Sequence, residues 1–136
     1  GVAGWFLVNR TMAKAEQARK EILQRWPQVA VTLGYPEAEV DLVLNATSLG
    51  LRADDALPLD TEQFPLRRAR SVYDMIYRPA ETPLLATARA SGCRAANGLS
   101  MLLYQGTRAL EIWTGHPAPV GVMRQALEQS LYRADD

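Results

Sequence analysis

The sequence has 136 residues, 48% of them hydrophobic, and this length suits one domain that buries its own core. The 15 Lys and Arg residues balance the 15 Asp and Glu residues without a long run of like charge, which argues against a nucleic-acid or membrane partner. A single cysteine excludes an internal disulfide and suits a reducing compartment, and Cys93 is expected to be a small buried apolar residue.

No targeting segment is recognisable in the sequence. The longest apolar run is too short to span a bilayer, and the first residues lack the basic start and cleavage pattern of a signal peptide. We therefore predict a cytoplasmic protein. The chain starts at Gly1 rather than Met, inside what looks like an element already under way, and this start predicts a fragment of a longer protein.

Short apolar runs in the first half predict strands that alternate with a helix and connecting segments. Residues 3–8 (AGWFLV) form a run too short for a helix, so we expect a strand buried on both faces. From Met12 apolar residues recur at the helical period until Trp26 and Pro27. Further strands are predicted at residues 28–33, 40–44 and 71–77. This alternation is typical of a parallel sheet with right-handed crossovers.

Helices predominate in the second half. Thr82 and Pro83 make a good N-cap and first-turn pair, and Gly92 suits the left-handed position after the helix that they open. Beyond a short CRAA segment, two further helices are predicted, at residues 98–114 and 119–132.

The helix over residues 98–114 carries two distinct faces. One narrow stripe, predicted to be core, consists of Leu99, Leu102, Leu103, Gly106, Leu110 and Trp113. Gly98, Met101 and Gln105, spaced three and four apart, share another face about 60° to 100° round the helix. That face places a thioether and an amide in line. A core-filling Met101 and a solvated Gln105 are the alternative interpretation.

Asn9, Arg10 and Thr11 follow the first predicted strand. In doubly wound nucleotide-binding sheets, an acid at the end of the adenosine-side strand bonds the ribose 2′-hydroxyl, whereas an Arg accommodates a 2′-phosphate. No acid stands here, and a guanidinium can hold phosphate oxygens with two parallel hydrogen bonds. The pattern indicates NADP rather than NAD. The alternative is a plain helix cap at Thr11 beside a solvated Arg10.

Four motifs follow one another along the chain: NRT after the first strand, NATSLGL at residues 45–51, YDMIYRPAETPLL at residues 73–85, and NGLSMLLYQG at residues 97–106. In this order and spacing they resemble the NADP-binding domain of the shikimate dehydrogenase family. The resemblance implies a Rossmann-like, doubly wound α/β fold. It also implies reduction of 3-dehydroshikimate to shikimate with NADPH in aromatic amino-acid biosynthesis, with quinate/shikimate dehydrogenases as paralogues.

The resemblance implies roles for residues of all four motifs. It assigns cofactor contacts to Asn9, Arg10, Thr11, Asn45, Ala46, Thr47, Ile76, Gly98 and Met101. Contacts to shikimate or 3-dehydroshikimate are assigned to Tyr77 and Gln105. The alternative for the segment that starts at Asn45 is a plain strand-to-helix turn. For Tyr77 it is a strand-end ring that is packed while its hydroxyl is solvated. Asp74, inside a strand, is expected to be a hydrogen-bonded structural carboxylate.

A proton donor for the ketone is missing from this sequence. The family takes a Lys and Asp pair from an N-terminal substrate-binding domain, whereas Lys14 and Lys20 both lie on the first predicted helix. The first strand and Gly-rich loop of the sheet are absent too. We therefore expect residues 1–136 to be a partial NADP-binding domain that works with a missing N-terminal domain of the same protein. No catalytic residue is assigned, and His116 and a metal site are not proposed.

Two classes of function stay open at this point. The first is an NADP-dependent shikimate dehydrogenase or its quinate/shikimate paralogue. The second is a non-catalytic nucleotide-binding or interaction domain that kept the fold. Met101, Gln105 and Tyr77, which face substrate by resemblance, favour the enzyme. A homodimer is a further open alternative.

Overall fold

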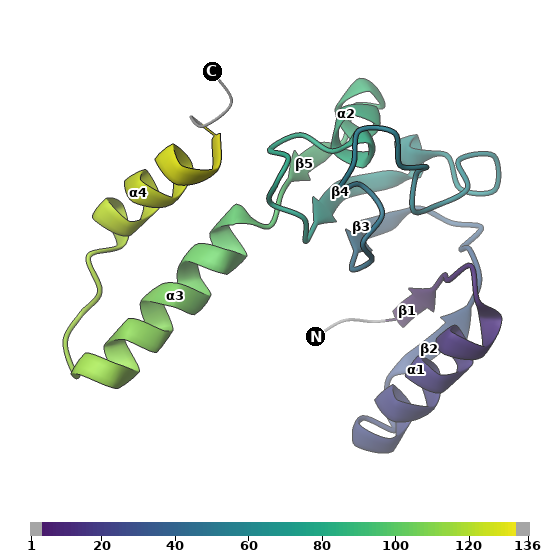
Figure 1. Ribbon diagram of the computed structural model, residues 1–136. Helices are drawn as coiled ribbons and strands as arrows, with labels where there is room; N and C mark the ends of the chain where they lie inside the picture. Colours follow the sequence, from purple (N-terminus) through teal and green to yellow (C-terminus); the bar gives the residue numbers. More distant parts are fainter. Residues whose placement is uncertain (1–3, 133–136) are drawn as a thin grey trace.

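The computed structural model describes residues 4–132 as short strands, four α-helices and one 3-10 turn (Figure 1). The strands are β1 (Gly4–Leu7), β2 (Ala30–Leu33), β3 (Val40–Asn45), β4 (Ala69–Asp74) and β5 (Arg94–Ala96). The helices are α1 (Met12–Arg25), α2 (Pro83–Ala90), α3 (Leu99–Thr114) and α4 (Val120–Tyr132), and the 3-10 turn is η1 (Leu66–Arg68). Residues 1–3, where the first predicted strand begins, and residues 133–136 lie outside the described residues.

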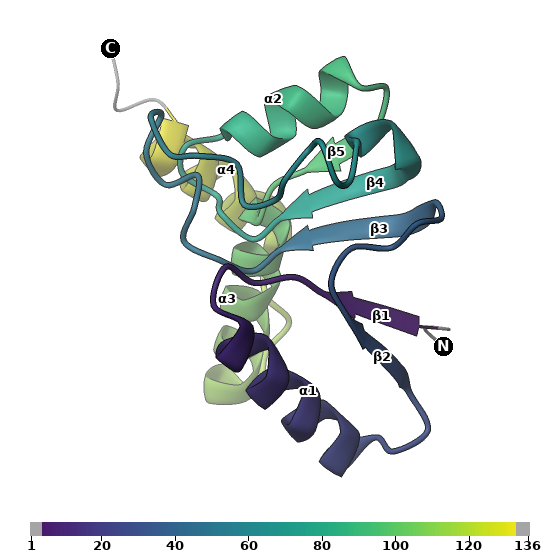
Figure 2. The same ribbon diagram turned by 90° about the vertical axis from the view of Figure 1, so that its right-hand side faces the viewer.

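The strands form two parallel sheets, β1-β2 and β3-β4-β5. In the second sheet Leu42 aligns with Ser71, and Ser71 aligns with Arg94. Within the described residues β1 and β3 are not hydrogen-bonded to each other, although they run side by side in the same direction (Figure 2). A doubly wound sheet has the strand order 3-2-1-4-5-6. The observed order is therefore that of a doubly wound sheet without the strand that separates its two halves.

The apolar side chains of β1 are more exposed than the sequence predicts. Trp5 is 42% exposed and Phe6 46% exposed, so burial of this strand on both faces was a wrong prediction. The reason is that β1 pairs only with β2, which leaves its other edge open. Leu42 and Leu44 of β3, at 54% and 52% exposed, show the same effect on the opposite side of the gap.

The hydrophobic core lies between β4 and α2. Val72 of β4 and Leu84, Leu85 and Ala88 of α2 are each at most 1% exposed. Cys93 belongs to the same cluster, and its thiol contacts the carbonyl oxygen of Leu66 at 3.0 Å. Burial raises the pKa of this thiol. The predicted buried role of Cys93 is confirmed.

Local signals at both ends of α2 act as predicted. The Thr82 side chain accepts a hydrogen bond from Leu85 N at 3.3 Å, and Pro83 occupies the first helical position. Gly92, with φ of +83°, takes the left-handed conformation just beyond the helix. The predicted cap and stop are confirmed.

Two boundaries in the second sheet differ from the prediction. β4 ends at Asp74 rather than Tyr77, because the Asp74 carboxylate accepts the N–H of Ile76 and turns the chain. Residues 94–96 form β5, which the sequence did not predict as a strand. Its three residues are too few to show a period.

Helices α3 and α4 form an antiparallel hairpin that extends away from the sheets (Figure 1). Leu99 and Leu103, near the sheet, are 8% and 2% exposed. Trp113, near the far end of α3, is 81% exposed, so its predicted core position is wrong. The stripe identifies one face of α3 correctly, but no described element covers that face at Trp113. No helix within residues 4–132 is long and apolar enough to cross a membrane.

Candidate functional site

A buried polar network joins the carboxyl ends of β3 and β4. Asn45 is 3% exposed, and its Nδ2 donates to Asp74 Oδ1 and to the carbonyl oxygen of Leu49, both at 3.0 Å. Its Oδ1 accepts from Thr47 N at 3.0 Å and from Thr47 Oγ1 at 2.8 Å. One amide therefore folds the loop after β3 around itself. Ala46 and Thr47 remain exposed on this loop.

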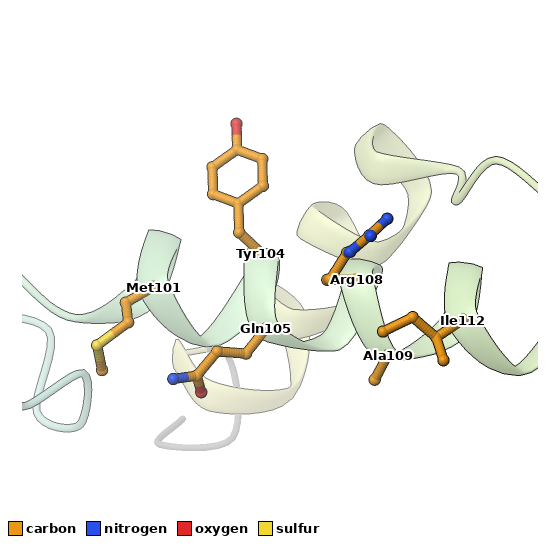
Figure 3. A pocket seen from close by; sticks show the side chains of 6 residues that line it. All are labelled: Met101, Tyr104, Gln105, Arg108, Ala109 and Ile112. Atoms are coloured by element: carbon orange, nitrogen blue, oxygen red, sulfur yellow. The ribbon is translucent and has the colours of Figure 1, made fainter.

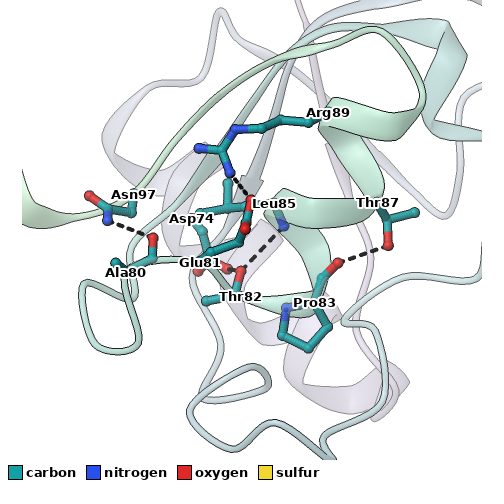
Figure 4. Close-up of polar contacts among 9 residues, drawn as sticks. All are labelled: Asp74, Ala80, Glu81, Thr82, Pro83, Leu85, Thr87, Arg89 and Asn97. Carbon is teal, nitrogen blue, oxygen red and sulfur yellow. Dashed lines mark hydrogen bonds and ion pairs between the residues drawn. The ribbon is translucent and has the colours of Figure 1, made fainter. Parts of the chain in front are cut away.

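Asp74 is the centre of the network and is fully buried. Besides Asn45, its carboxylate accepts from Ile76 N at 3.1 Å. It also accepts from Thr82 Oγ1 at 2.7 Å, as Figure 4 shows. Three donors thus satisfy a carboxylate inside the protein. Asp74 is a structural carboxylate, as predicted, and it fixes the end of β4 relative to the start of α2.

The start of α3 lies against the segment that follows β4. Gly98 N donates to the carbonyl oxygen of Ile76 at 3.0 Å. A Cβ at Gly98 would lie 2.0 Å from the carbonyl oxygen of Met75, far inside van der Waals contact. A glycine is therefore required by this packing alone. Ile76 is 7% exposed, and Tyr77, half-buried, comes directly after it.

The exposed side of α3 forms a shallow open hollow. Its lining residues are Met101, Tyr104, Gln105, Arg108, Ala109 and Ile112. Figure 3 shows the side chains of Met101 and Gln105 extending from the same side of the helix, with Tyr104 on the other side. Gln105 is exposed and Met101 is half-buried. The thioether and the amide therefore lie in line, as the helical spacing predicts.

The NRT segment lies at the end of β1 and the start of α1. Thr11 occupies the N-cap position without a side-chain capping bond, and its N–H donates to Asn9 Oδ1 at 2.9 Å. Arg10 is exposed and forms no ion pair with any residue in the range 4–132. The first turn of α1 contains no acidic residue. A cation and a helix start thus face solvent together.

All these segments leave the sheets at one edge. Figure 2 shows β1, β3 and β4 running in the same direction, so residues 9–11, 45–47 and 75–77 follow strand ends on the same side. Asn45, Ile76 and Gly98 are linked through Asp74 and the backbone. The segment 9–11 lies beyond the gap between the two sheets and has no hydrogen bond to that group.

Two polar residues near this edge were missed by the sequence reasoning. Asn97 Nδ2 donates to the carbonyl oxygen of Ala80 at 2.9 Å and to Tyr132 Oη at 3.1 Å. Tyr132 belongs to α4, 35 residues away. Nothing local in the sequence marks a contact across such a separation. No group of three His, Cys, Asp or Glu side chains suited to a metal occurs within the described part of the chain.

Sequence comparison identifies the chain. The family model described as "Shikimate 5'-dehydrogenase C-terminal domain" matches residues 98–128. The shikimate dehydrogenase (NADP(+)) of Methanocella arvoryzae is 40% identical over 129 residues, a match that covers 92% of this chain and 47% of that relative. The chain belongs to the shikimate dehydrogenase family. It spans about half the length of the curated relatives that it matches.

Solved structures of a shikimate dehydrogenase and of a quinate dehydrogenase share the fold. A shikimate dehydrogenase in complex with NADP+ is 31% identical, with a TM-score of 0.76, over 94% of this chain and 47% of that one. The quinate dehydrogenase of Corynebacterium glutamicum in complex with NAD is 28% identical, with a TM-score of 0.78, over 96% of this chain and 48% of that one. The predicted Rossmann-like doubly wound fold is confirmed.

Proposed function

We propose that this chain is the NADP-binding part of a shikimate dehydrogenase, which interconverts 3-dehydroshikimate plus NADPH and shikimate plus NADP+. The single observation that carries the proposal is the common sheet edge. In this member of the shikimate dehydrogenase family, the loops after β1, β3 and β4 all lie at that edge. The start of α3 lies against the segment that follows β4. Ligands of open α/β sheets bind outside the carboxyl ends of the strands.

The end of β1 fits the phosphate of NADP. Three features favour a bound anion here. Arg10 is exposed and forms no ion pair among the described residues. The first turn of α1 has no side-chain capping bond and no acidic residue. We assign the adenosine 2′-phosphate to Arg10, with Asn9 and Thr11 shaping the turn. An acid here would select the unphosphorylated ribose instead.

The loops after β3 and β4 would carry the rest of the dinucleotide. The network around Asp74 holds Asn45 and presents exposed Ala46 and Thr47, whose small side chains let a ligand approach the backbone. Ile76 and Gly98 would form the next part of the surface that contacts the dinucleotide. When bound, the nicotinamide supplies the hydride, and Gly98 and Met101 would lie against its ring.

Substrate contacts in this chain are assigned to Tyr77 and Gln105. A phenol and an amide can each bond a hydroxyl or a carboxylate oxygen. Gln105 extends into the hollow beside Met101, so a substrate placed there would lie beside the nicotinamide end (Figure 3). The proton donor would come from a Lys and Asp pair of an N-terminal substrate-binding domain, and we place the whole enzyme in the cytoplasm.

A steady-state assay of the full-length protein tests this proposal. Shikimate and quinate are each offered with NADP+ and with NAD+. We expect shikimate with NADP+ to give the highest kcat/KM, and residues 1–136 alone to be inactive. A preference for quinate with NAD+ would favour the paralogue, and NADP+ binding without turnover of either substrate would favour the non-catalytic domain.

A further inference from the structure

The C-terminal end of α4 is hydrogen-bonded to segments of the candidate site through one side chain, the phenol of Tyr132. Tyr132 Oη donates to the carbonyl oxygen of Tyr77 at 2.8 Å and accepts from Asn97 Nδ2 at 3.1 Å. These partners lie 55 and 35 residues away in the sequence. One hydroxyl therefore bonds both the turn after β4 and the residue immediately before Gly98.

Asn97 extends this connection on both sides. Its Nδ2 also donates to the carbonyl oxygen of Ala80 (Figure 4). Its Oδ1 accepts from Leu99 N at 3.1 Å. Tyr132, Asn97, Tyr77 and Ala80 thus form a continuous hydrogen-bonded chain. It joins the last turn of α4 to the first turn of α3 and to the turn that carries Tyr77.

Helix α4 packs mainly against α3. None of its side chains is fully buried. Gly106 of α3 leaves room for Met123, whose Cε lies 3.6 Å from where a Cβ on that glycine would be. The Tyr132 hydroxyl therefore anchors a helix whose main packing partner is α3.

We propose that Tyr132 is a positioning residue for the substrate side of the site. Its hydroxyl fixes the backbone of Tyr77 relative to the start of α3, and so sets the distance between the phenol of Tyr77 and the face that carries Met101 and Gln105. This inference rests on the proposed function, because it takes Tyr77 and Gln105 as the substrate contacts. The cofactor phosphate end at Arg10 lies beyond the gap between the sheets, so Tyr132 should not influence it.

The test replaces Tyr132 in the full-length protein. Tyr132→Phe keeps the ring and removes the hydroxyl, whereas Tyr132→Ala removes both. We expect Tyr132→Phe to raise the KM for shikimate about threefold to tenfold, because one net hydrogen bond is worth about that factor, with the KM for NADP+ changed less than about twofold. A purely packing role would instead leave Tyr132→Phe like the wild type and move only Tyr132→Ala.

Tyr35→Phe is the matched control. The Tyr35 hydroxyl also accepts a hydrogen bond, from Asp60 N at 2.6 Å. The Tyr35 ring stacks on Phe64 of the core cluster, away from the site. We expect its KM for shikimate to equal that of the wild type. An unchanged KM in Tyr132→Phe, or an equal rise in Tyr35→Phe, would overturn the positioning role.

Hydrogen exchange separates this inference from the proposed function. If the wild type does not oxidise shikimate, the proposed function fails, and the anchoring by Tyr132 is judged on amide exchange alone. Tyr132→Phe should then speed exchange at residues 76–82 and 97–100 while leaving residues 30–33 unchanged. Exchange at the wild-type rate in both segments would overturn the anchor itself.

Discussion

Asp74 and Thr82 lie eight residues apart, and their side chains meet inside the protein, with Thr82 Oγ1 donating to Asp74 Oδ2 at 2.7 Å. The same threonine oxygen accepts from Leu85 N at 3.3 Å and so caps α2. One hydroxyl thus serves the end of a strand and the start of a helix. Both elements border the proposed site.

Thr82→Val should destabilise the protein although valine and threonine have nearly the same side-chain volume. Valine keeps the shape but loses the cap and leaves the buried carboxylate one donor short, which together should lower the free energy of unfolding by about 2 to 4 kcal/mol. Thr87→Val is the control, since Thr87 Oγ1 bonds only the carbonyl oxygen of Pro83, at 2.8 Å. It should lose about 1 kcal/mol. Urea unfolding that shows equal losses for both variants would contradict the role of Thr82.

Gly98→Ala should disrupt the junction between α3 and β4. The new Cβ would lie 2.0 Å from the Met75 carbonyl oxygen, a backbone atom that cannot swing away. We expect a loss of at least about 3 kcal/mol of stability, measured by thermal unfolding. Gly106→Ala in the same helix makes only an ordinary contact at 3.6 Å and should gain about 0.5 to 1 kcal/mol. A Gly98→Ala protein as stable as Gly106→Ala would refute the close approach.

Local chemistry made some elements predictable and left others hidden. The bounds of α2 follow from Thr82, Pro83 and Gly92, whose effects act within a few residues. β5 was missed because three residues carry no period. Trp113 was expected in the core, because a helical stripe shows which residues share a face but not what covers it.

Gln105→Ala should weaken substrate binding and leave cofactor binding unchanged. Gln105 is exposed in the hollow on α3, and its side chain forms no hydrogen bond with another residue in the range 4–132, so its removal should leave stability within about 0.5 kcal/mol. We expect the KM for shikimate to rise about tenfold, as for a lost hydrogen bond to a bound ligand, with the Kd for NADP+ kept. Gln125→Ala on α4 is the control. Unchanged substrate kinetics in Gln105→Ala would remove this residue from the site.

Cys93 should be inert to alkylation in the folded protein. The residue is 8% exposed, and burial raises the pKa of its thiol, so the reactive thiolate is disfavoured. Mass spectrometry after iodoacetamide at neutral pH should find the peptide containing Cys93 unmodified until urea is added. The raised pKa also means that stability is complete below the ordinary thiol pKa and falls as the pH rises from there toward the raised value. Labelling of the native protein at the rate of a free thiol would contradict the burial.

As with the fold, some residues of the candidate site could be predicted from local sequence patterns, whereas the contacts between distant segments could not. Residues 9–11 and 45–47 were identified because they directly follow apolar strands, and parallel strands end at one edge. The network from Asn45 through Asp74 to Thr82 and the bond from Tyr132 to Tyr77 join segments far apart in the chain. Their register depends on how the elements pack, which no local pattern in a single sequence contains.

The discrimination between NADP+ and NAD+ tests the central claim most directly. Fluorescence titration of the full-length protein should give Kd values for both cofactors, in the wild type, in Arg10→Ala and in the control Arg19→Ala, which removes an exposed cation from α1, the helix that follows Arg10. We expect Arg10→Ala to weaken NADP+ binding about 10- to 100-fold, the effect of losing hydrogen bonds to a charged phosphate, while the Kd for NAD+ changes less than about twofold. Equal losses for both cofactors, or no loss for either, would contradict the assignment of Arg10 to the 2′-phosphate.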